Sequence, residues 1–255
     1  MSSFFCATQV LWKREIVRFL RQRSRLIGAF ATPLMFWLFI GGGLQNSFKN
    51  PSGGGQGYFE FFYPGAILLS VLFTAIFSTI SVIEDRHQGF LQGVLVSPAP
   101  RSSLVFSKVL GGATLGVFQG LILLGLAPFV GTPLGFVQVI QILLLLFWMA
   151  SCLTLLGFVF AWKIDSVQGY HSMMNLVLFP MWLLSGAVFP LEGAHPVFQW
   201  LGLVNPLSYG IKSMRQLMAL APDASSLASS LTMLLVLSAV LFGISLRLVC
   251  SSKES

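Results

Sequence analysis

Charged side chains are scarce in this sequence, and their scarcity limits the class of protein. Only 9% of the 255 residues are Asp, Glu, Lys or Arg, and 55% are hydrophobic. A soluble domain carries about a quarter charged residues to keep its surface hydrated. Apolar runs of about twenty residues recur along the whole chain, which is typical of membrane-spanning helices. The composition therefore excludes a soluble protein and predicts one all-α integral membrane domain over residues 1–255.

Cysteine and histidine are also too few and too scattered to form a disulfide framework or a metal centre. Cys6, Cys152 and Cys250 are odd in number and fit no ligand spacing, and the three histidines fall in separate regions. We therefore expect no metal site. The first apolar run begins near Leu26, behind a basic segment and without a small-residue cleavage site, so we expect no cleaved signal peptide.

Motifs for nucleotide hydrolysis and acyl transfer are missing as well. No lysine follows a glycine, which excludes the G-x-x-x-x-G-K-[ST] loop of an ATPase, and no G-x-S-x-G nucleophile elbow occurs. The glycine-rich stretch Pro51–Gly57 is interpreted as a flexible loop facing outward. Almost no ionisable residue lies in the middle of an apolar run, which disfavours a stand-alone proton- or ion-coupled transporter.

The apolar runs predict six membrane spans and a topology. The spans are Leu26–Leu44, Tyr63–Ile83, Val109–Val130, Gly135–Trp162, Tyr170–Pro190 and Leu227–Val249. An even number places both termini on one side, and the loops of that side hold all but three of the 15 basic residues. By the positive-inside rule both termini are cytoplasmic. The net charge of +7 therefore reflects topology, and no nucleic-acid partner is expected.

Residues 1–25 precede the first span and have helical periodicity. Their apolar residues lie opposite a basic stripe formed by Arg14, Arg18, Arg21 and Arg25. This pattern predicts an interfacial helix whose stripe faces anionic lipid headgroups at the membrane surface. The alternative is a charge cluster that only sets topology.

The polar segment 84–97, between the second and third spans, is predicted to form a short cytoplasmic helix from Glu84 to Val96. Glu84 and Asp85 would complement the exposed N–H groups of its first turn. Its apolar face consists of Phe90, Leu91, Val94 and Leu95. Such a face favours docking against a partner protein, and the alternative is a helix that lies on the membrane.

Two further patterns concern packing and the outer surface. Gly112, Gly116 and Gly120 form overlapping G-x-x-x-G units, which predict a helix packed closely against a neighbour. Residues 191–220 are apolar but interrupted by Pro196 and Pro206. They predict a pair of short re-entrant or surface helices on the outer side, with two additional tilted spans as the alternative.

Two motifs resemble those of ABC-2 type transporter permeases. The first is the pattern Glu84-x-Arg86-x-x-Gly89-x-Leu91-x-x-x-Leu95-x-x-Pro98. The second is similar to the family's P-x-x-x-x-S-G-x-x-F-P element followed by N-P-[LTS]-[ST]-Y and a late arginine. Its matching residues here are Pro180, Ser185, Gly186, Phe189, Pro190, Asn205, Pro206, Tyr209 and Arg215. The likeness extends over nearly the whole chain and is strongest to the bacterial drug-resistance and nodulation-factor exporters.

The resemblance implies a transport subunit without enzymatic activity in the bacterial inner membrane. Its segment 84–97 would be a coupling helix that contacts a separate ABC ATPase, present in two copies, which binds ATP and Mg²⁺; this chain would hold no cofactor. The implied contact residues are Glu84, Asp85, Arg86, Gly89, Phe90, Leu91 and Leu95. A second permease protomer, identical or related, would complete the membrane path.

The substrate is less constrained by the sequence. The aromatic residues of the first spans suit an amphiphilic or lipid-linked substrate, and the expected pathway residues are Phe73, Phe77, Asn175 and Phe179. Two alternatives stay open at this point. One is the membrane subunit of a cytochrome-biogenesis ABC transporter, and the other is a channel or secondary transporter that works without an ATPase.

Overall fold

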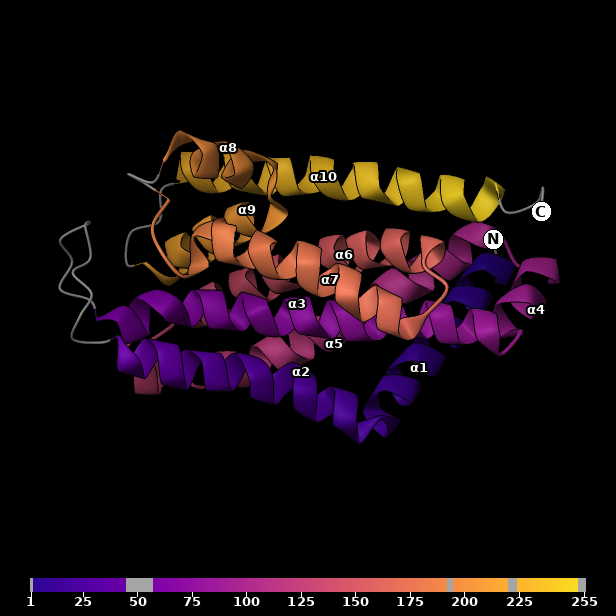
Figure 1. Ribbon diagram of the computed structural model, residues 1–255, viewed down its shortest axis with the longest axis horizontal. Helices are drawn as coiled ribbons and strands as arrows, with labels where there is room; N and C mark the ends of the chain where they lie inside the picture. Colours follow the sequence, from indigo (N-terminus) through magenta and orange to yellow (C-terminus); the bar gives the residue numbers. More distant parts are fainter. Residues whose placement is uncertain (1, 45–56, 192–194, 220–223, 252–255) are drawn as a thin grey trace.

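The computed structural model describes residues 2–44, 57–191, 195–219 and 224–251, and every element in these ranges is a helix (Figure 1). The elements are α1 (Ser2–Arg21), α2 (Arg23–Phe36), η1 (Trp37–Gly41), α3 (Tyr58–His87), α4 (Phe90–Val96), α5 (Arg101–Leu124), η2 (Ala127–Val130), α6 (Phe136–Lys163), α7 (Val167–Trp182), η3 (Leu183–Ala187), α8 (Pro196–Val204), α9 (Pro206–Met218) and α10 (Ala224–Ser251). Elements η1 and η3 are π-helices, and η2 is a 3₁₀ helix. No strand occurs in these ranges, as the all-α prediction requires. The predicted loop 51–56 and residues 192–194 and 220 of the outer segment lie outside the described residues.

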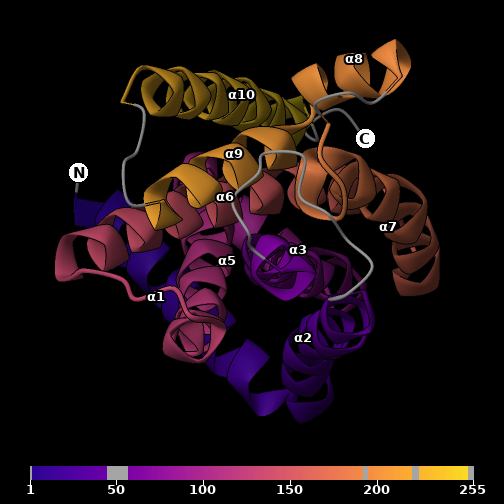
Figure 2. The ribbon, with the colours of Figure 1, turned by 90° about the vertical axis from the view of Figure 1, so that its left-hand side faces the viewer.

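Helix α3 forms the centre of the bundle. Its side chains are buried almost without interruption from Phe61 to Ile83, and α2, α5, α6 and α7 pack around it (Figure 2). A helix that is apolar on all sides is expected at such a position. Its 30 residues correspond to about 45 Å at 1.5 Å per residue, so its two ends lie at opposite ends of the molecule.

Helices α5 and α6 approach each other closely along the glycine stripe. A Cβ atom on Gly116 would lie 2.7 Å from the Cβ of Ala150, and one on Gly120 would lie 2.7 Å from the Cδ1 of Leu146. Any larger residue at these positions would push the two helices apart. The predicted close packing of this stripe is therefore confirmed, and its basis is the small-residue contact common between membrane helices.

Among the described residues, five helical segments are long and apolar enough to cross a membrane. They are Arg23–Gly41, Tyr58–His87, Arg101–Leu124, Phe136–Lys163 and Ser225–Ser251. The predicted span Tyr170–Pro190 falls on α7 and η3, which follow one another from Val167 to Ala187. Helix α7 alone has 16 residues, because the chain changes to a π-helix at Leu183.

Side chains from α9 and its N-cap satisfy the backbone where α7 and η3 are irregular. Asn205 Nδ2 donates to the carbonyl of Met181, and Arg215 Nη2 donates to the carbonyl of Gly186 at 2.8 Å. The Arg215 guanidinium also lies 3.9 Å from the centre of the Phe61 ring. Backbone groups freed inside a membrane protein need such partners. Arg215 of the second motif thus holds the end of η3 against α3 and α9.

The predicted short helices of the outer segment are present, but the helix predicted from Glu84 to Val96 is wrong in its boundaries. Helices α8 and α9 correspond to the expected pair. At the other segment, α3 continues to His87 and α4 begins only at Phe90. The carboxylates of Glu84 and Asp85 therefore stand at the end of a helix. Their partners are cations from elsewhere in the chain, not the N–H groups of a first turn.

Candidate functional site

The candidate site is the corner between α3 and α4, together with the charged residues that hold it. The corner lies at the same end of the molecule as α1 and the end of α10 (Figure 1). Gly89 occupies the turn with a φ of 72°, in the left-handed region that glycine adopts at little cost. Ser97 and the prolines at 98 and 100 then separate α4 from α5.

The apolar face of α4 is buried against the protein itself, whereas the sequence predicted that it would be exposed for docking. Leu91 is only 4% exposed, and Val94 and Leu95 pack against the core. Phe90 is covered by the Arg14 guanidinium, whose carbon lies 3.6 Å from the ring centre. The apolar face that was expected to dock on a partner thus holds α4 to its own chain. The residues exposed at the corner are His87, Gln88, Gly89, Gln92, Gly93 and Val96.

Lys108 of α5 lies at the centre of a buried ionic cluster beneath this corner. Its ammonium donates to Glu15 Oε1 at 2.7 Å, to Ser81 Oγ at 2.8 Å and to Asp85 Oδ2 at 2.7 Å. These three bonds use every proton of the ammonium group. Asp85 is 0% exposed, Lys108 4% and Glu15 7%. The cluster therefore joins α1, α3 and α5 through an ammonium group whose three protons are all hydrogen-bonded.

The arginines of α1 complete the cluster, which corrects the prediction that their stripe faces lipid headgroups. Arg14 binds both carboxylate oxygens of Asp85, and Arg18 bridges Asp85 and Glu84. Arg25, at the start of α2, also binds Glu84. Of the predicted stripe only Arg21 is exposed. The stripe is helical as expected, but it faces acidic residues of α3. The two carboxylates at the end of α3 form charge-assisted hydrogen bonds with the arginines, and these bonds are more specific than an attraction to lipid headgroups.

Pairing with acidic residues outweighs burial in the electrostatics of Arg14. Burial opposes a rise in the pKa of the Arg14 guanidinium, but the hydrogen bonds and charge of Asp85 raise it above its ordinary value. Three carboxylates face four cations here: Glu15, Glu84 and Asp85 against Arg14, Arg18, Arg25 and Lys108. A buried charge is tolerated only when it is paired and hydrogen-bonded. The members of the cluster therefore stabilise one another as a set.

Arg86 points to a different neighbour from Glu84 and Asp85. Its guanidinium donates to the carbonyl of Trp162 at 2.5 Å and to Asp165 Oδ1 at 2.7 Å. His87 bonds the carbonyl of Asp165 at 2.6 Å. Both residues thus tie the end of α3 to the end of α6, where the last carbonyls of a helix lack intrahelical partners.

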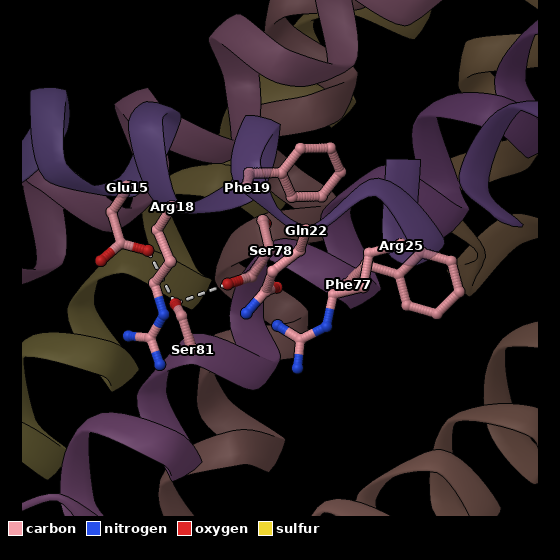
Figure 3. A pocket seen from close by; sticks show the side chains of 8 residues that line it. All are labelled: Glu15, Arg18, Phe19, Gln22, Arg25, Phe77, Ser78 and Ser81. Atoms are coloured by element: carbon pink, nitrogen blue, oxygen red, sulfur yellow. Dashed lines mark hydrogen bonds between the residues drawn. The ribbon is translucent and has the colours of Figure 1, made fainter. Parts of the chain in front are cut away.

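A small cavity borders the cluster between α1 and α3. Figure 3 shows Arg18 of α1 extending toward Ser81 of α3, and Phe19 and Ser78 also line the cavity. The cavity measures about 10 Å³, which is room for about one water molecule and too little for an organic ligand. Gln22 Oε1, on its wall, has no hydrogen-bond partner among the described residues.

The four residues expected along a substrate pathway lie on α3 and α7. Phe73 and Phe77 are half-buried on α3, and the Phe77 ring lies 6.0 Å from the ring of His171 on α7. Asn175 and Phe179 are exposed and one helical turn apart on α7. The structure thus brings two of the pathway residues to a helix that flanks α3 (Figure 2). Their part in substrate passage stays a prediction.

Sequence reasoning missed the role of Glu15 and Lys108. The available signals were a single acidic residue within the basic N-terminal segment and a single lysine at the edge of the third span. Within the part of the chain that the structure describes, no group of three metal-ligating side chains comes together.

Comparison with known proteins shows which family this chain resembles. A family model described as "ABC-2 type transporter" matches residues 7–219. The chain is 27% identical over 219 residues to the putative transport permease ycf38 of Cyanophora paradoxa, covering 84% of this chain and 76% of the relative. It is 27% identical over 220 residues to the inner membrane transport permease YadH of Escherichia coli, covering 84% of each. It is 27% identical over 214 residues to nodulation protein J of Rhizobium leguminosarum bv. trifolii, covering 82% of this chain and 79% of the relative.

Proposed function

Since the chain belongs to the ABC-2 type transporter family and is a membrane permease of an ABC transporter, we propose that it exports an amphiphilic or lipid-linked substrate by alternating access. The family match carries this proposal. It runs from α1 to α9 and so includes both the ionic cluster and the α3–α4 corner. The membrane is the inner membrane of a bacterium, as in the name of the YadH relative.

A separate ATPase subunit drives the transport in this proposal. The sequence has no G-x-x-x-x-G-K-[ST] loop, so ATP and Mg²⁺ are bound by the partner, in two copies, one for each permease protomer. The contact surface is the exposed side of the α3–α4 corner, which includes Gly89, Gln92 and Val96. Asp85 and Leu91 are buried, which supports a contact surface with fewer of the seven residues that the resemblance implies.

The ionic cluster transmits movement of this corner to the rest of the bundle. A force on α4 reaches α3 through one turn at Gly89, and Lys108 and Arg14 connect α3 to α5 and α1. Because Asp85 and Lys108 are buried and their charges are paired, separating them is costly, so the three helices move as one body. A second protomer, identical or related, completes the path beside Phe73, Phe77, Asn175 and Phe179.

A site-specific crosslinking experiment tests the partner and its contact surface. A photoreactive amino acid is placed at Val96, which is 86% exposed on α4, or at Val197, which is 55% exposed on α8 at the opposite end. Crosslinks formed in intact cells of the source organism are identified by mass spectrometry. We expect Val96 to capture a protein that carries the ATPase loop motif and Val197 to capture none.

The proposal is overturned if Val96 captures no ATPase while the chain is produced and inserted normally. A crosslink to the ATPase from Val197 alone would place the contact at the wrong end of the molecule. Loss of export on deletion of the captured ATPase completes the test, because a channel or secondary transporter would keep working without it.

A further inference from the structure

A large cavity opens at the end of the molecule opposite the ionic cluster. It measures about 830 Å³ and lies between the start of α3, the end of η3 and the helices α8 and α9. Figure 2 shows α9 crossing beside the start of α3, with α8 next to it. The volume is within the range of about 300–1,000 Å³ that is usual for small-molecule sites.

One wall of the cavity is a polar stripe on α9. Ser208, Lys212 and Gln216 follow one another at intervals of four residues and line the cavity together. The opposite face of α9 is buried in the bundle through residues such as Leu207 and Met214. The stripe is therefore directed at the cavity by the way α9 packs.

Several polar groups at this cavity have no hydrogen-bond or salt-bridge partner among the described residues. Ser208 Oγ and Gln216 Oε1 are buried atoms without a hydrogen bond among the described residues. The salt bridges and hydrogen bonds of the described ranges include none for the Lys212 ammonium or for the Glu60 carboxylate on the α3 side of the cavity. Glu60 lies in the first turn of α3, where the helix dipole stabilises a negative charge. That stabilisation does not occupy the carboxylate oxygens, which can still accept hydrogen bonds.

Lys212 and Glu60 are opposite charges that line one cavity and have no partner among the described residues, and this combination defines the chemistry of a ligand. We propose that this cavity binds a zwitterionic amphiphile whose head carries a phosphate or carboxylate next to a primary amine. The acidic group binds Lys212, and the N–H donors of the amine bind Glu60 and Gln216 Oε1. Phe61, Leu191 and Ile211 supply apolar wall for the attached chain.

Lipid binding to the purified chain tests the proposal by native mass spectrometry. After removal of lipid, the chain is titrated with phosphatidylethanolamine, phosphatidylcholine or phosphatidylglycerol. Phosphatidylcholine lacks N–H donors and phosphatidylglycerol lacks the cation, so we expect each to bind about tenfold more weakly than phosphatidylethanolamine. Lys212→Ala and Glu60→Gln should each weaken phosphatidylethanolamine binding about tenfold. Lys13→Ala, which removes an exposed lysine of α1, should change nothing.

Two results overturn the proposal. One is equal binding of the three lipids, and the other is unchanged binding in both the Lys212→Ala and Glu60→Gln variants; either shows that Lys212 and Glu60 do not select a zwitterionic head group. The source of the ligand is read from the chain purified without removal of lipid. A retained mass of phosphatidylethanolamine assigns the site to membrane lipid, and another zwitterionic amphiphile assigns it to the substrate. No ATPase is needed, so the outcome is independent of the proposed function.

Discussion

Lys108 shows how a single residue can fix the relation of three helices. An ammonium group has three protons, and here each is donated to a different side chain on α1 or α3. Asp85 in turn accepts from Lys108, Arg14 and Arg18. Such an arrangement contributes little net stability compared with an apolar core of the same shape, but losing one member leaves the others buried and unpaired. The cluster therefore specifies one arrangement of the helices.

Replacing Lys108 with methionine should strongly destabilise the protein. The change keeps the length of the side chain but leaves Glu15 without its main partner, at a cost of roughly 3–5 kcal/mol. We expect the midpoint of thermal unfolding in detergent to fall by roughly 10 °C. The control is Lys163→Met, which removes an exposed lysine of α6 and should have little effect. Adding Glu15→Gln to Lys108→Met should recover part of the loss. Equal midpoints for Lys108→Met and Lys163→Met would refute the role of the cluster.

At the scale of helices, length and hydropathy predicted most of the bundle, whereas helix ends were predicted poorly. Each predicted span overlaps a helix because about twenty apolar residues in a membrane have few other options. The end of α3 was misplaced because Glu84 and Asp85 are consistent with either end of a helix until their partners are known. Most of those partners are distant in sequence: Arg14 and Asp85, for example, are 71 residues apart. A single sequence contains no signal for such a pairing.

The turn between α3 and α4 gives a prediction that isolates backbone conformation. A Cβ atom at either Gly89 or Gly93 would meet no atom within 4 Å, so neither position is restricted by space. Gly89 has a φ of 72°, whereas Gly93 lies inside α4. Gly89→Ala should therefore cost about 1–2 kcal/mol, and Gly93→Ala should be neutral or stabilise by up to about 1 kcal/mol. The unfolding midpoints of the two variants measure the difference. A Gly89→Ala variant as stable as Gly93→Ala would show that the turn tolerates another conformation.

For the whole molecule, the ionic cluster and the large cavity lie at opposite ends of α3. The cluster end also carries α1, α4 and the end of α10, and the cavity end carries α8 and α9 (Figure 1). Most of the 15 basic residues belong to loops and helices predicted on the cluster side. If that end is cytoplasmic, as the positive-inside rule predicts, α4 faces the compartment that holds ATP and the cavity faces outward.

Labelling of single cysteines tests this orientation. Cys6, Cys152 and Cys250 are first replaced, and Val96→Cys or Val197→Cys is then introduced. Both positions are exposed, at 86% and 55%, so the rest of the chain does not shield either cysteine from the reagent. An impermeant thiol reagent added to spheroplasts should label Val197→Cys and should label Val96→Cys only after the membrane is permeabilised. The reverse pattern would place α4 outside the cell. The proposed ATPase contact would then fail, whereas the lipid preference of the cavity could still be measured on the purified chain.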